Sequence, residues 1–112
     1  MNESILTSIK KLLGIAEEYT HFDTDIMIHI NSVFMTLHQL GVGPAAGYRI
    51  DSVADEWNEF VSSEANLEAV KTYMYLKVRL VFDPPTNASV LNAYKEEIEK
   101  LEWRLNVQAE TE

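Results

Sequence analysis

The chain has 112 residues, about the length of one domain, and 46% of them are hydrophobic, which is enough to build a core. Its 9 basic residues stand against 18 acidic ones, and a formal net charge of −9 argues against broad contact with DNA phosphates or anionic membranes. It has no cysteine, so disulfides, thiol catalysis and cysteine-ligated zinc are excluded.

The N-terminal segment lacks the order of a signal peptide, because Lys10 and Lys11 follow the first apolar residues. No apolar run approaches the roughly 20 residues that a membrane span needs. We therefore expect a soluble protein made in the cytoplasm and not secreted. We expect residues 1–112 to form a single helical domain, with about 108–112 as a frayed tail.

Two helices are predicted in the first third of the chain. Residues 4–13 have their apolar side chains at helical spacing, and Gly14 is suited to the left-handed turn that ends such a helix. Asp23 is a good N-cap for a second helix over 24–40. This second helix is apolar on more than one face, which is typical of a helix that is central or partly covered by a partner.

Two further helices are predicted in the middle of the chain. A short one is expected from Ser52, where Asp55 completes a near capping box, and Trp57, Phe60 and Val61 would anchor it to the core. Asn66 is the candidate cap for a helix over 67–82. The prolines that follow Asp83 would stop that helix.

The last predicted helix opens at Thr86 or Asn87 and reaches about Val107. Its apolar residues alternate spacings of three and four, which predicts a coiled-coil-like seam; they are Leu91, Tyr94, Ile98, Leu101 and Leu105. No segment has a pattern that predicts a strand. The fold class is therefore all-α, a compact bundle of four to five helices with a long C-terminal helix.

Candidate catalytic and metal sites are weak in this sequence. Asp25 and His29 are four residues apart and would share a helix face, so a metal half-site is conceivable, but an ordinary contact between them is the favoured interpretation. A triad of Ser32, His29 and Asp25 on a helix surface would lack an oxyanion hole. A helical-bundle metal enzyme would need Glu-x-x-His motifs on facing helices, and the one such spacing, Glu18 to His21, falls in the predicted loop over 16–22. We predict no enzyme, no catalytic residue, no cofactor and no metal.

Two side chains leave alternatives open. Trp103 lies off the Leu101–Leu105 seam, so it either widens the core contact or anchors, with Arg104, an interface between subunits. Arg79 either extends its stem past apolar neighbours or pairs with an acid such as Asp83. The candidate core or interface residues are Phe34, Trp57, Arg79, Phe82, Asp83, Pro84, Pro85, Leu101, Trp103, Arg104 and Leu105.

The segment Lys71–Pro85 (KTYMYLKVRLVFDPP), followed by a helix ending in Glu102–Asn106 (EWRLN), resembles the head–tail connector family of long-tailed phages and prophages. Residues 4–15, 21–26 and 30–34 are similar to that family as well, so the likeness spans nearly the whole chain. The most specific part is Val78–Pro85 (VRLVFDPP).

The resemblance implies a helical bundle whose copies form a ring under the portal, join the head to the tail and surround the channel through which DNA leaves. The implied partners are other copies of the chain, the portal protein and downstream head-closure or tail proteins, with no sequence-specific nucleic acid binding and no membrane. The protein would move from the host cytoplasm into the head–tail interface of the virion. The main alternative is a small regulatory or antitoxin-like dimer, which usually carries a basic recognition helix, and no helix here has one.

Overall fold

The computed structural model describes residues 3–61 and 64–110, and in this part of the chain the all-α prediction is confirmed. Five helices are present there: α1 Ile5–Leu12, α2 Asp23–Gln39, α3 Trp57–Phe60, α4 Glu64–Phe82 and α5 Ala88–Glu110. The extended pairing found in the described ranges is a single isolated antiparallel bridge between Ser4 and Glu56.

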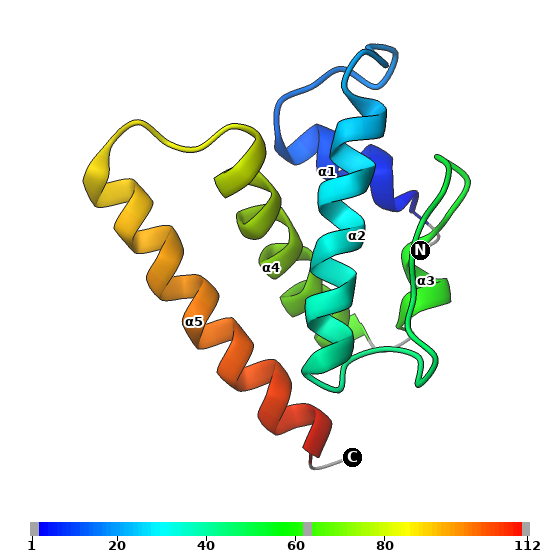
Figure 1. Cartoon of the computed structure of the whole chain (residues 1–112), viewed down its shortest axis with the longest axis vertical. Coiled ribbons are helices and arrows are strands. Elements are labelled where there is room, and N and C mark those ends of the chain that lie inside the picture. Colours follow the sequence, from blue (N-terminus) through cyan, green and yellow to red (C-terminus); the bar gives the residue numbers. More distant parts are fainter. Residues whose placement is uncertain (1–2, 62–63, 111–112) are drawn as a thin grey trace.

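Helix α4 is the centre of the bundle, because it packs against α1, α2 and α5. In Figure 1, α5 lies on one side of α2 and α4, while α3 and the segment that joins α2 to α3 lie on the other. The molecule is flattened, with extents of 39 × 35 × 21 Å. Two broad flanks, one on α5 and one on α2 with its following segment, therefore face away from each other.

The core is built around large side chains from several helices. Phe34 of α2, Trp57 of α3 and Tyr73 of α4 are each fully buried. The Phe34 ring lies 5.1 Å from the ring of Tyr48 and 4.7 Å from that of Phe60, measured between centroids. These contacts fix residues 48–60 onto α2, although only the short α3 is regular in that range.

Two predicted helix starts are wrong. Asp23 is the first residue of α2 rather than its cap, and its carboxylate forms an ion pair with Lys10 Nζ at 2.8 Å. The third helix begins at Trp57, where the backbone N–H of Glu56 donates to Glu59 Oε1 at 3.0 Å. The predicted start at Ser52 is a turn instead, in which the Ser52 N–H donates to Asp55 Oδ2.

The last two helices match the sequence more closely. Helix α4 begins at Glu64, so the prediction that Asn66 caps it is wrong, and it ends as predicted at Phe82, directly before Asp83 and the prolines. Asn87 caps α5, because its Oδ1 accepts from the N–H groups of Ser89 and Val90 at 2.8 and 3.2 Å. Helix α5 continues to Glu110, so 108–110 are helical rather than frayed, while 111 and 112 lie outside the described residues.

Candidate protein-interaction surfaces

The described residues contain no group of three or more His, Cys, Asp or Glu placed to hold a metal ion. Asp25 and His29, for which an ordinary contact was the favoured interpretation, therefore have no third ligand of those types in that part of the chain. Across the same ranges, none of the helices is both long enough and apolar enough to cross a membrane.

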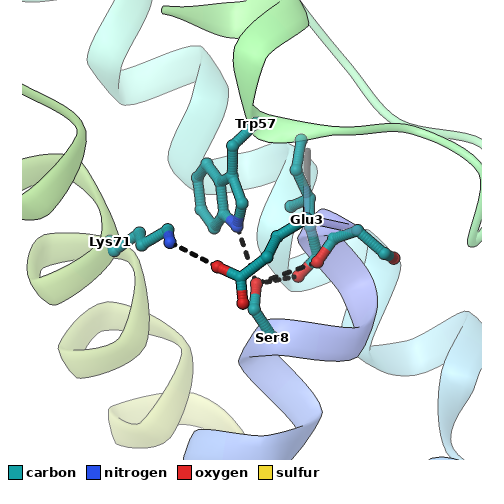
Figure 2. Close-up of polar contacts among 6 residues, drawn as sticks. Glu3, Ser8, Trp57 and Lys71 are labelled. Carbon is teal, nitrogen blue, oxygen red and sulfur yellow. Dashed lines mark hydrogen bonds and ion pairs between the residues drawn. The ribbon is translucent and has the colours of Figure 1, made fainter. Parts of the chain in front are cut away.

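A polar network fastens the start of the chain to α4 (Figure 2). Lys71 Nζ donates to Glu3 Oε1 at 2.6 Å and lies 5.8 Å from the centre of the Trp57 ring. Trp57 Nε1–H donates to Ser8 Oγ at 2.7 Å. The hydrogen bond from Lys71 holds the pKa of the Glu3 carboxyl below its usual value. Lysine and carboxylate neutralise each other here, so the network serves to tie α1, α3 and α4 together.

A buried ammonium group shapes the segment between α1 and α2. Lys10 is 2% exposed, and its Nζ donates to the carbonyl oxygens of Glu17 and Tyr19 at 2.9 and 2.8 Å, besides its ion pair with Asp23. The sequence carried one signal for this: Lys10 follows Leu6 by four residues and thus shares its buried face. By binding two carbonyls, Lys10 holds 13–22 in a defined loop.

The end of α4, the segment that carries the most specific resemblance, forms a corner with α5. Arg79 donates through Nη1 to the hydroxyls of Tyr75 and Tyr94 at 2.9 and 3.1 Å, and through Nε to the backbone carbonyl of Asp83 at 3.2 Å. Its partner at Asp83 is thus the main chain. Phe82 is half-buried, with its ring 5.3 Å from that of Phe22.

The prolines complete this corner without entering the core. Asp83 and Pro84 are exposed, while Pro85 is half-buried. The segment between α4 and α5 therefore presents a polar and proline-rich edge to solvent.

Helix α5 has one buried face and one exposed apolar ridge. Leu101 and Leu105 are buried at 5% and 3% exposure, as the predicted seam requires. Trp103, in contrast, is 69% exposed and Arg104 beside it is exposed, so Trp103 does not widen the core contact within one subunit. Glu99, Lys100, Trp103 and Arg104 lie together on this exposed face of α5, and we call the surface that they form the Trp103 ridge.

Helix α2 also exposes large apolar side chains, namely Ile28 at 57% and Met35 at 66%. Beside Met35 lies a depression of about 250 Å³, the Tyr48 hollow, lined by Asn31, Phe34, Met35, His38, Gly47, Tyr48 and Arg49. Gly47 lies in a turn closed by its own backbone N–H, which donates to the carbonyl oxygen of Pro44 at 2.9 Å. Its φ is +89°, a backbone conformation that favours glycine. This turn brings Tyr48 back onto α2.

The Tyr48 hollow has an acidic edge. The Tyr48 hydroxyl donates to Glu59 Oε1 at 3.1 Å. Burial, the hydrogen bond to Glu59 and the negative charges of Glu59, Asp55 and Asp51 all raise the pKa of Tyr48 above its usual value. The negative charges of three carboxylates therefore influence the electrostatic potential at the Tyr48 rim of this apolar depression.

A family model described as phage connector protein matches residues 5–112. The chain belongs to the phage connector protein family. The resemblance seen in the sequence is thereby confirmed, and membership places this connector among structural phage proteins that contact other head or tail proteins. No curated protein and no solved structure matches the chain.

The connector divides its predicted candidate residues between core and surface. Phe34, Trp57, Leu101 and Leu105 belong to the core, and the other candidates lie wholly or partly at the surface. Two features were missed from the sequence. The Lys10 site depends on carbonyls of a loop, and the Tyr48 hollow depends on how 43–50 folds back, and neither arrangement follows from helical periodicity.

Proposed function

We propose that this connector is one subunit of a homo-oligomeric ring that joins the portal of the phage head to the tail and surrounds the DNA exit channel. Its partners are other copies of itself, the portal protein and downstream head-closure or tail proteins. The subunit is made in the host cytoplasm and ends at the head–tail interface of the virion. It performs no catalysis of its own.

The observation that carries the proposal is the exposure of large apolar side chains on two separate flanks of a phage connector. Met35 on α2 and Trp103 on α5 are each about two-thirds exposed, at 66% and 69%. A ring of identical subunits needs heterologous contacts, in which two different surfaces of each copy meet. Helix α5 and the segment that follows α2 lie on opposite sides of the bundle (Figure 1), and the apolar side chains exposed on α5 and α2 supply two such surfaces.

The test uses the purified full chain, alone and mixed with the portal protein of the same phage, followed by light scattering and negative-stain microscopy. We expect rings whose population grows with concentration, or rings seated on the portal. The portal alone, examined under the same conditions, is the control for added density. A chain that stays monomeric across the concentration range and does not bind the portal would contradict the proposal.

A further inference from the structure

We infer that the Trp103 ridge of one subunit docks into the Tyr48 hollow of the next copy, with the indole of Trp103 seated against Met35 and Tyr48. This inference rests on the proposed ring and assigns its subunit contact to particular residues. It makes the contact heterologous, since the ridge belongs to α5 and the hollow to α2 and the segment after it.

The ridge has the character of an interface anchor. Trp103 is the most exposed of the large hydrophobic side chains on the described surface, at 69%. Because Leu101 and Leu105 are buried against the bundle, α5 cannot rotate to bring Trp103 inward without exposing them. Buried tryptophans dominate the binding energy of many interfaces, and arginines such as Arg104 are common beside them.

The hollow has the size and the surface to accept an indole. Its volume is about 250 Å³, whereas a cavity of about 150 Å³ already holds a benzene ring. Phe34 is fully buried among its lining residues, and Met35 is 66% exposed. A thioether against an aromatic ring is a favourable contact, and methionine adapts its shape to an incoming side chain.

The charges of the two surfaces are complementary. The ridge carries Lys100 and Arg104 with one acid, Glu99. The hollow carries Arg49 and His38, but Glu59, Asp55 and Asp51 act on its Tyr48 rim. The three carboxylates outnumber the single guanidinium of Arg49, so the charge of this rim is negative on balance. The cationic side chains next to Trp103 are therefore attracted to it, and the docking has a preferred orientation.

The position of the two surfaces favours a second copy as the occupant. In Figure 1, α5 and the segment after α2 lie on opposite sides of α2. A subunit that offers its ridge to a neighbour therefore leaves its own hollow free for the next subunit. Such head-to-tail contacts close into a ring when the rotation between subunits allows it.

Disulfide trapping tests the contact directly, because the chain has no cysteine of its own. We compare Arg104→Cys on the ridge, Asp51→Cys on the acidic rim of the hollow and the double variant, under mild oxidation in the conditions where the wild type assembles. The inference predicts a ladder of covalent dimers, trimers and larger species for the double variant and monomers for each single variant. A dimer from Arg104→Cys alone would show that α5 meets α5, and it would overturn the inference.

Substitution provides the second measurement. We expect Trp103→Ala to raise the concentration needed for half-assembly by at least about tenfold. The matched control is Val90→Ala, which alters another exposed side chain of α5 and leaves assembly unchanged. Rings that form without a ladder and with unaltered Trp103→Ala assembly would overturn this contact while the proposed ring stands. Failure of the wild type to form any oligomer, with or without portal, would overturn both.

Discussion

At the scale of single residues, Lys10 occupies a position that lysine rarely takes in a small domain, because an ammonium group is costly to remove from water. It is 2% exposed, and the cost is offset by two carbonyl oxygens and by Asp23, all within 2.9 Å of its Nζ. The Lys10 side chain takes the place of water as hydrogen-bond donor to two backbone carbonyls of the loop between α1 and α2. It therefore ties the end of α1 to this loop and, through Asp23, to the start of α2.

Lys10→Met tests this role. The variant keeps the apolar stem but leaves Asp23 and the two carbonyls without their partner, so we expect the free energy of unfolding to fall by about 3 kcal/mol. Urea denaturation measures the loss. Lys11→Met is the matched control, since Lys11 is exposed and its loss should cost no more than about 0.5 kcal/mol. A loss below about 1 kcal/mol for Lys10→Met would show that the Lys10 contacts are dispensable.

Trp57 illustrates a core residue that the sequence identified correctly. It is fully buried, and its Nε1–H is satisfied by Ser8 Oγ. Trp57→Ala should therefore lower the free energy of unfolding by about 3–5 kcal/mol. Thermal or urea unfolding gives the value, with Val53→Ala, an exposed apolar position before α3, as the control. A change below about 1 kcal/mol would mean that Trp57 lies at the surface in solution.

At the scale of helices, α5 carries two faces with opposite roles. Leu101→Asp places a carboxylate in the seam against α4 and should cost more than about 4 kcal/mol, enough to unfold much of the protein. Trp103→Asp, two residues away on the exposed ridge, should change the free energy of unfolding by less than about 1 kcal/mol while preventing assembly. Circular dichroism and light scattering separate the two effects. Normal rings from Leu101→Asp would contradict the buried seam.

The contact between α4 and α5 also predicts an alkaline limit. Tyr73 is fully buried and its hydroxyl donates to Glu102 Oε2 at 2.7 Å. Burial, then the bond to Glu102 and its negative charge, raise the pKa of Tyr73 above the ordinary value of about 10. The folded state therefore disfavours the phenolate, so its contribution to stability is complete below pH of about 10 and is lost as the pH rises further.

Tyr73→Phe should thus lose about 1 kcal/mol at neutral pH, because it lacks the hydrogen bond to Glu102. Above pH of about 10 its stability should fall less steeply than that of the wild type, by up to about 1.4 kcal/mol per pH unit. Tyr48 remains in the variant, and its raised pKa preserves part of the slope. Urea titrations between neutral and alkaline pH provide the measurement, and identical slopes would refute the assignment to Tyr73.

Helical periodicity was sufficient to predict these elements but not their exact starts. The seam of α5 and the stop after Phe82 follow from spacing and from proline chemistry, which act over a few residues. Asp23 has the side chain of a cap, yet its carboxylate is used by Lys10, thirteen positions earlier in the chain. Cap preferences are worth about 1 kcal/mol, so a buried ion pair outweighs them.

At the scale of the whole molecule, periodicity shows which face of a helix is buried but not which helix covers it. The central place of α4 and the return of 43–50 onto α2 depend on contacts between distant residues. For the same reason Trp103 could be assigned to the core or to an interface from sequence alone. The packing of α5 against the bundle decides between these two assignments, because it leaves the Trp103 side chain 69% exposed.

The net charge of −9 leads to the last prediction, which concerns the wall of the proposed channel. An acidic subunit repels phosphates, so DNA could pass through a ring of such subunits without adhering. We expect no saturable binding of a 30-base-pair duplex at physiological salt in fluorescence anisotropy, where basic proteins bind non-specifically with a Kd of about 10⁻⁴–10⁻⁶ M. The cationic side chains of the ridge do not alter this expectation, since Lys100 and Arg104 are covered by the neighbour in the proposed contact.

Salt dependence makes this test discriminating. Binding driven by released counterions strengthens steeply as salt is lowered, whereas an acidic subunit should gain no affinity under the same change. A basic DNA-binding protein titrated in parallel supplies the positive control. A Kd tighter than about 10⁻⁵ M at physiological salt would contradict a repelling channel wall and would favour the regulatory, DNA-binding alternative, whose recognition surface would then have to be sought among the nine basic residues.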